Sequence, residues 1–234
     1  MCPASYLAPE TLRHKFAVLA GTKVATICGG GYKNMTNSSN TIKYSINAAD
    51  EIVEVGGEWD IFAVENDSPP ELFSGSILHR SFWAFVSGDA LRHVYRRIME
   101  QVRAGKSMDF SFRCDSPDLR RFLSLQMSPT ADGGIEFVTE TICTEARKFQ
   151  NVFDINAPRT AQVIVACSWC NKLKSGVDTW QEPEEAIRTL ALFETDTIPT
   201  LSHGMCNGCY NLVLGTVKTS WIDSHILRQV SFAA

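Results

Sequence analysis

Four cysteines in the last third of the chain are spaced as two Cys-x-x-Cys pairs. Cys167 and Cys170 form the first pair, Cys206 and Cys209 form the second, and 35 residues separate them. A short Cys-x-x-Cys loop directs two thiolates at one ion, and two such loops supply the tetrahedral sulfur set that Zn²⁺ accepts. The spacing therefore predicts a structural zinc (Zn2+) site at Cys167, Cys170, Cys206 and Cys209, whose metal contributes directly to folding.

His203 precedes the second pair by three residues. A histidine there either replaces one cysteine as an alternative ligand or supports a ligand from outside the coordination sphere; we favour support, because four thiolates already fill a tetrahedron. The alternative for the pairs is a thiol redox switch that cycles between dithiol and disulfide. Counting thiols with and without a chelator separates the zinc site from the switch.

Composition limits the class of protein. Hydrophobic residues make up 44% of the 234 residues and charged residues 21%, which is typical of a soluble globular chain. No apolar run is long enough to span a bilayer, and the apolar stretch before Lys23 is too short for a secretory signal. We therefore expect a cytoplasmic protein, in which paired cysteines are metal or redox sites rather than structural disulfides.

The sequence offers no recognisable catalytic constellation. We find no nucleophile with a matching base, no phosphate-binding loop, and only three adjacent glycines where a dinucleotide loop needs spaced ones. Cys114 follows Arg113, which would favour a reactive thiol, but buried packing is the preferred interpretation. We predict that the protein is not an enzyme. The net charge of −4, with an acidic excess in the cysteine module, argues against binding to nucleic acid or to a membrane.

Periodicity predicts the elements that position these residues. Alternating apolar residues indicate strands, and apolar residues three and four apart indicate helices. The expected strands cover 41–46, 52–55, 108–112, 122–127 and 135–142, and the expected helices cover 58–66 and 89–103. Two strands, then helices, then three strands indicate an α+β fold: an antiparallel sheet of five strands with helices on one face.

A second, smaller module follows. A strand at 163–165 leads into the first cysteine pair, and a helix at 183–193 must bridge the two pairs. We expect a small zinc-ribbon-like domain. The predicted organisation is an N-terminal extension (1–40), the sheet domain (41–147), a linker (148–162), the four-cysteine zinc-binding-like module (163–214) and a C-terminal tail (215–234).

The sheet domain resembles the PAS sensor-domain family over about residues 41–147. The resemblance rests on Asp50–Val55 followed by Trp59 and Phe62, then on 75–85 ahead of the long helix, and on the three closing strands. The Arg-Cys-Asp-x-Pro segment at 113–117, with the Cys-x-Trp-Cys and His-Gly-x-Cys-x-x-Cys segments downstream, is similar to a bacterial subgroup of PAS proteins. The resemblance implies a PAS-like five-stranded antiparallel sheet and a role in bacterial signal transduction.

That resemblance implies a non-enzymatic sensor or interaction protein. The PAS-like core would hold an unidentified small ligand or mediate homodimer contact, and a separate signalling protein would be the partner. Haem is not predicted, because His93 falls on the solvent side of its helix together with Arg92 and Arg96. Flavin is not predicted either, because Arg121–Gln126 lacks the cysteine of light-sensing domains. The alternative is a zinc-module adaptor for protein or nucleic acid, with the PAS-like domain only structural.

Overall fold

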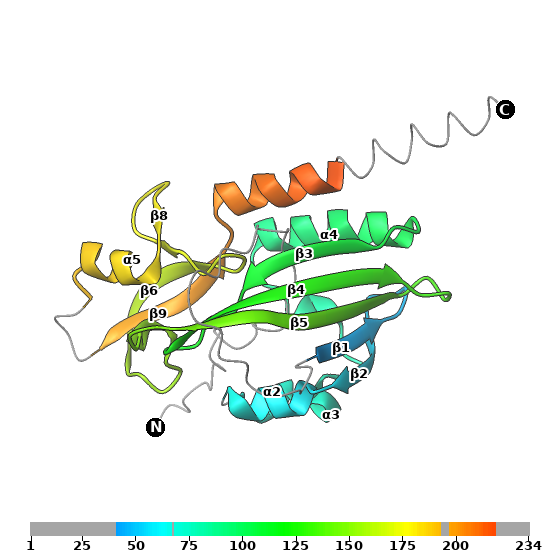
Figure 1. The fold of residues 1–234 in the computed structure, drawn as a ribbon, viewed down its shortest axis with the longest axis horizontal. Helices are drawn as coiled ribbons and strands as arrows, with labels where there is room; N and C mark the ends of the chain where they lie inside the picture. Colours follow the sequence, from blue (N-terminus) through cyan, green and yellow to red (C-terminus); the bar gives the residue numbers. More distant parts are fainter. Residues whose placement is uncertain (1–40, 67, 193–196, 219–234) are drawn as a thin grey trace, which may run out of the picture.

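The computed structural model describes residues 41–66, 68–192 and 197–218. The predicted extension at 1–40 and most of the predicted tail lie outside the described residues. The described chain builds two sheets that lie side by side, a larger antiparallel one and a smaller mixed one, with helices packed against them (Figure 1). The α+β class expected from the sequence is confirmed.

The larger sheet has five strands in the order β2-β1-β5-β4-β3, and every neighbouring pair is antiparallel. Its strands are β1 (Thr41–Ile46), β2 (Ile52–Gly57), β3 (Met108–Arg113), β4 (Leu119–Pro129) and β5 (Ile135–Ala146). All five strands lie where alternation predicts them. The structure extends β4 and β5 beyond the predicted segments, because polar residues near their ends still pair across the ladder.

Register aligns the apolar side chains of neighbouring strands on one face. Tyr44 lies opposite Phe137, which in turn lies opposite Met127, and all three side chains are buried. The Tyr44 and Phe137 rings stack with centroids 4.4 Å apart and an interplanar angle of 9°. This alignment creates one continuous apolar surface, since side chains two residues apart on a strand share a face.

The turn between β4 and β5 depends on glycine. Gly133 has φ of 81°, a left-handed conformation that a residue without a Cβ adopts without strain. A Cβ on the neighbouring Gly134 would lie 2.2 Å from the Ile46 carbonyl oxygen. The two glycines therefore let the hairpin close against the end of β1.

Helical segments between β2 and β3 cover the apolar face of this sheet (Figure 1). They are α2 (Trp59–Glu65), η1 (Pro70–Leu72), α3 (Ser74–Ile77), η2 (Phe82–Ala84) and α4 (Asp89–Arg103). The long helix α4 buries the apolar stripe predicted from its sequence: Leu91, Val94, Tyr95, Ile98 and Val102, together with Met99. Phe82 packs edge-on against Tyr95 and closer to parallel with Phe137, so aromatic rings fill the space between helix and sheet.

The smaller sheet is mixed and has the order β8-β7-β6-β9. It contains β6 (Arg159–Cys167), β7 (Leu173–Lys174), β8 (Trp180–Gln181) and β9 (Ile198–Gly204), with η3 (Asn151–Phe153) before it and α5 (Pro183–Thr189) between β8 and β9. β6 begins inside the segment predicted as a linker. The parallel pairing of β6 with β9 requires a crossover, which β7, β8 and α5 provide.

A last helix occupies residues 207–218. Its Val213 and Val217 belong to the same buried cluster as the apolar residues of α4 and of the larger sheet. The Tyr210 ring also lies 6.1 Å from the ring of His93 on α4. Cys167, Trp169 and Cys206 join this cluster, so the hydrophobic core of the larger sheet continues into the cysteine-bearing part of the chain.

Candidate metal centre

The first cysteine pair lies in the tight hairpin that joins β6 to β7. β6 ends at Cys167, whose amide donates to the Lys172 carbonyl over 2.7 Å while its carbonyl accepts from Asn171. Asn171 adopts φ of 57°, a left-handed conformation that asparagine tolerates well. The chain therefore turns back within a few residues, and Cys167 and Cys170 lie on the same side of the loop.

Parallel pairing brings the second pair to the same place. In the β6–β9 register Cys167 lies opposite Gly204, two residues before Cys206. The amide of Ser168 donates to the Gly204 carbonyl over 2.8 Å. Both strands end at the same edge of the sheet, so the residues that follow them meet there. Cys206 immediately precedes the last helix, and Cys209 lies in its first turn.

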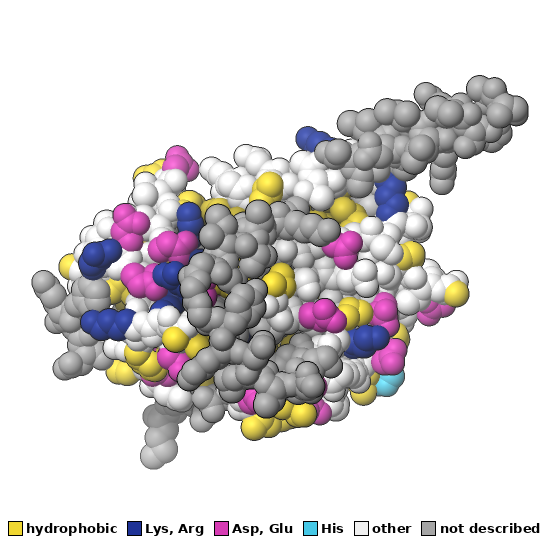
Figure 2. Space-filling view, viewed as in Figure 1, with side chains coloured by type: hydrophobic (Ala, Val, Ile, Leu, Met, Phe, Trp, Pro, Cys, Tyr) yellow, Lys and Arg dark blue, Asp and Glu magenta, His cyan; other side chains and the backbone are white. Residues whose placement is uncertain are grey.

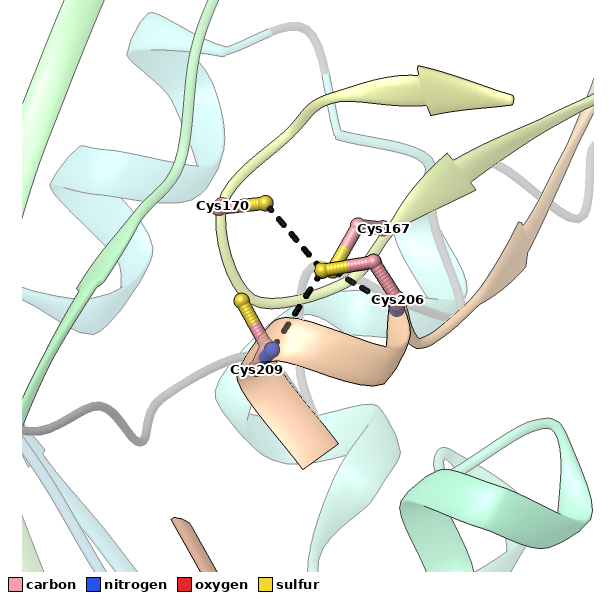
Figure 3. A group of neighbouring side chains, drawn as sticks. All are labelled: Cys167, Cys170, Cys206 and Cys209. Atoms are coloured by element: carbon pink, nitrogen blue, oxygen red, sulfur yellow. Dashed lines mark hydrogen bonds between the residues drawn. The ribbon is translucent and has the colours of Figure 1, made fainter. Parts of the chain in front are cut away.

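All four cysteine sulfurs converge (Figure 3). Their Sγ atoms lie within 4.8 Å of one another, and the Sγ atoms of Cys170 and Cys206 are 3.9 Å apart. A tetrahedral zinc ion with four bonds of about 2.3 Å places its sulfurs about 3.8 Å apart. The donor set and its spacing therefore fit a tetrahedral ion such as Zn²⁺.

Backbone amides support the sulfurs. The amide of Cys206 donates to the Cys167 sulfur, and the amide of Cys209 donates to the Cys206 sulfur, each over 3.4 Å. Such N–H donors stabilise negative charge on sulfur, as does the positive end of the last helix. Cys167 and Cys206 are buried, whereas Cys170 and Cys209 are partly exposed, so one side of the centre faces the core and the other faces outward.

Crowding shifts the acidity of the thiols in opposite directions. The pKa of Cys206 is lowered because its sulfur accepts hydrogen bonds from Cys167, Cys170 and Cys209. The pKa values of Cys170 and Cys209 are raised because each keeps its proton in hydrogen bonds within the cluster, first with Cys167. A divalent cation held here would supply the positive charge with which all four become thiolates, so its binding would release protons.

His203 does not join the four sulfurs. It lies on β9 in register with Ala166, and the clustered metal-ligating atoms in the described chain come from the four cysteines. Among the other sequence candidates, Cys114 is buried and lies outside the cluster. His93 is exposed on α4. The structure thus assembles the four predicted sulfur ligands and leaves the three other candidates apart from them.

The hairpin that carries the first pair packs against the larger sheet. The side chain of Trp169, between Cys167 and Cys170, is 3% exposed and meets the Phe110 ring edge-on at 6.0 Å. Its carbonyl accepts a hydrogen bond of 2.9 Å from the amide of Arg113 at the end of β3. The cysteine centre is therefore attached directly to an edge strand of the larger sheet.

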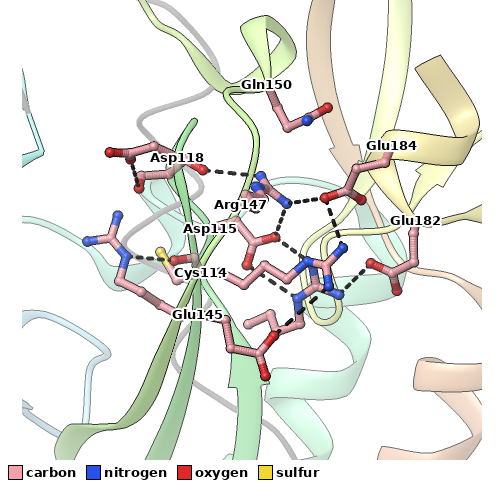
Figure 4. Close-up of polar contacts among 12 residues, drawn as sticks. Cys114, Asp115, Asp118, Glu145, Arg147, Gln150, Glu182 and Glu184 are labelled. Atoms are coloured by element: carbon pink, nitrogen blue, oxygen red, sulfur yellow. Dashed lines mark hydrogen bonds and ion pairs between the residues drawn. The ribbon is translucent and has the colours of Figure 1, made fainter. Parts of the chain in front are cut away.

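A second set of polar residues joins the two sheets, and Figure 4 shows its centre. Asp115, whose side chain has no exposed surface, pairs with Arg113 at 2.5 Å and with Arg147 at 3.0 Å. Arg113 also binds Glu182 at 2.7 Å, just before α5. Burial alone would lower the pKa of Arg113, but Asp115 and Glu182 outweigh burial and raise it. The guanidinium therefore stays charged in its buried position.

Glu184 on α5 extends the network back to the larger sheet. Its carboxylate lies 2.8 Å from Arg120 and 3.6 Å from Arg147. In the space-filling view, acidic and basic side chains lie mixed on the side that carries α5 and the smaller sheet (Figure 2). The charges of this network pair with one another and attach α5 to the larger sheet.

Sequence patterns do not connect these charges. The 113–117 segment and the arginines nearby stand out in the sequence, whereas Glu182–Glu185 indicate only a helix start. The available signal was the opposite charge of the two segments, which lie about 70 positions apart in the sequence. Charge alone does not identify which acidic residue pairs with which arginine, because many combinations are possible. Only the tertiary packing determines the pairs.

Comparisons with known proteins do not assign this chain to a family, so the interpretation of the cysteine centre depends on the structure. No protein-family model matches the chain, and no curated protein sequence matches it significantly. Among the described residues, no helix combines the length and apolar character needed to cross a membrane.

Proposed function

We propose that this protein is a non-enzymatic signal-transduction protein, in which a PAS-like domain serves as a sensor or interaction module and a structural zinc ion holds its C-terminal part. The observation that carries the proposal is the convergence of four cysteine sulfurs from two distant segments. Four thiolates complete the tetrahedral coordination of the ion and leave no open coordination position for a substrate. A closed site of this kind favours a structural role over a catalytic one.

The larger sheet supports the PAS-like part of the proposal. Five antiparallel strands with the helical segments inserted between β2 and β3 agree with the arrangement that the sequence resemblance implies. The space between α4 and the sheet is filled by Tyr44, Phe82, Tyr95 and Phe137. This packing favours an interaction role for the domain over a role that depends on a bound small ligand.

Mass spectrometry under native conditions tests several parts of the proposal together. We expect one zinc ion per chain, and the same spectrum reports a retained small ligand and a homodimer. A folded protein without metal would rule out the structural zinc site.

The proposal includes a cytoplasmic location. The unbridged state of the six described cysteines agrees with it.

Removing a buried ligand tests the site directly. We expect Cys206→Ser to abolish stoichiometric zinc binding and to lower the melting temperature, because three thiolates hold the ion less tightly and the metal contributes to folding. Cys143→Ser is the matched control, since Cys143 lies on β5 outside the cluster, and it should retain one zinc. Metal analysis and thermal melting with and without a chelator measure both effects. Zinc retained at full stoichiometry by Cys206→Ser would assign the metal elsewhere.

A further inference from the structure

The cysteine centre is asymmetric. Cys167 is fully buried and Cys206 is 8% exposed, whereas Cys170 and Cys209 are partly exposed. Figure 3 shows Cys170 on the hairpin loop and Cys209 on the last helix, with dashed lines that join the Cys206 sulfur to the Cys170 sulfur and to the Cys209 amide. Cys170 and Cys209 are therefore the residues of the centre that are more accessible to a small oxidant from solvent.

A partner sulfur is already in contact with one of the exposed ones. The Sγ atoms of Cys170 and Cys206 lie 3.9 Å apart, and a disulfide bond needs about 2.05 Å. The sulfurs thus have to approach by roughly 2 Å. The two cysteines come from different Cys-x-x-Cys pairs, so a bond between them would draw the β6–β7 hairpin toward the last helix.

We propose that the centre is a peroxide-sensitive metal clamp, in which oxidation joins Cys170 to Cys206 and releases the metal. This inference rests on the proposed structural zinc site and adds a regulator to it. In the first step, the Cys170 thiolate attacks one peroxide oxygen, the O–O bond breaks, and a sulfenic acid and hydroxide form. In the second step, the Cys206 thiolate displaces hydroxide from that sulfur and forms the disulfide.

The electrons and ligands balance. The two sulfurs lose two electrons, and hydrogen peroxide gains them as it becomes two hydroxide ions. Cys167 and Cys209 then remain as the only thiolates of the set, and two thiolates do not complete a tetrahedral site. The metal therefore dissociates, and a dithiol reductant with added zinc restores the clamp.

The fold places a sensitive contact beside the reacting sulfur. Trp169 immediately precedes Cys170, packs against Phe110 and accepts the hydrogen bond from the Arg113 amide. Movement of Cys170 toward Cys206 displaces the adjacent Trp169 and disturbs its contacts with β3. Oxidation is thus expected to expose the Arg113 amide, and amide hydrogen exchange in the 108–113 segment reports it.

The test starts from the full chain with its zinc content measured. We expect equimolar hydrogen peroxide to release zinc to a chromogenic chelator, to join the peptides that contain Cys170 and Cys206, and to speed exchange at Arg113. Cys170→His keeps a nitrogen ligand for the metal while it removes the attacking thiolate, so its release should be about tenfold slower or more. Cys143→Ser leaves the reacting pair and all four clustered sulfurs intact and should release zinc at the rate of the unmodified protein.

The outcomes separate this inference from the proposed function. Absence of zinc before oxidation would contradict the structural metal site itself. Zinc bound at the start and retained under peroxide would overturn only the clamp. A bridge that excludes Cys170, mapped in the unmodified protein, would also overturn it, and this mapping does not depend on whether Cys170→His folds.

Discussion

At the residue scale, Asp115 shows why a charged group is retained in the interior. Its carboxylate has no exposed surface and neutralises Arg113, while its second contact is with Arg147. Taking three charges out of water is costly, and only close geometry with full hydrogen bonding offsets that cost. The arrangement is therefore sensitive to loss of any one partner, and most sensitive to loss of the central carboxylate.

We expect Asp115→Asn to lower the free energy of unfolding by about 3 kcal/mol, because two buried guanidinium groups lose their shared counter-charge. Asp118→Asn is the matched control, since Asp118 is exposed and three positions away, and it should change stability by less than about 0.5 kcal/mol. Urea unfolding followed by circular dichroism measures both. Equal small effects for the two variants would show that the ion pairs of Asp115 with Arg113 and Arg147 make no net contribution to the free energy of unfolding.

At the element scale, α5 is attached to the larger sheet through its first turn. Pro183 and Ala186 lie on the buried side of α5. Glu184 pairs with Arg120 and Arg147 across the boundary between the sheets. Burial raises the pKa of Glu184. Its backbone amide and the two arginines lower the pKa by more than burial raises it, so the net shift is downward. The folded state therefore prefers the charged carboxylate.

This shift gives the attachment a pH dependence. A carboxylate with a lowered folded-state pKa stabilises the fold above its unfolded pKa and loses that effect as pH falls through the folded pKa. We expect Glu184→Gln to cost about 1 kcal/mol at pH 7, and the difference from the unmodified protein to shrink as pH falls through the lowered pKa of the folded-state carboxylate. Glu185→Gln, on the exposed neighbour, should show no such dependence. Denaturant unfolding at several pH values checks this, and a difference that persists at low pH would contradict the ion-pair explanation.

At the scale of the whole molecule, one hydrophobic core crosses from the larger sheet to the cysteine centre. Val213 and Val217 of the last helix share a buried cluster with α4, whereas a separate smaller cluster lies within the second sheet and α5. The last helix also begins at two of the proposed metal ligands. The four-cysteine centre, the last helix and α4 are thus physically connected through one core.

We expect Val213→Ala to cost about 2 kcal/mol and to speed amide exchange in α4 as well as in the last helix, because it leaves a cavity in a shared core. Leu212→Ala is the matched control on the same helix, since Leu212 is 50% exposed. Hydrogen exchange followed by mass spectrometry distinguishes them. Faster exchange confined to the last helix would show that the core does not transmit the change.

In the described part of the chain, the exposed large apolar residues are scattered over several elements. Ile61 and Val64 lie on the outer side of α2 and are 57% and 64% exposed. Hydrophobic side chains are visible at the bottom of the molecule, over α2, in Figure 2. Single exposed apolar residues are normal on a soluble protein and carry no functional assignment alone.

The sequence by itself determined the local structure and named the four sulfurs that cluster. Alternation located the five strands, because one buried face forces a period of two, and helical spacing located the inward residues of α4. Two Cys-x-x-Cys pairs named four sulfurs, since each pair is short enough to act locally. Sequence periodicity also placed His93 on the solvent side of α4, where the structure has it.

Only the tertiary structure decided which distant segments of the chain come into contact. The mixed sheet, with β6 parallel to β9, brings the two distant cysteine pairs to one edge, and no local pattern specifies a parallel partner beyond a crossover. The pairing of Arg113 with both Asp115 and Glu182 joins segments whose charges alone fit many partners. Local spacing determines which side chains an element presents, whereas long-range packing determines which of them meet.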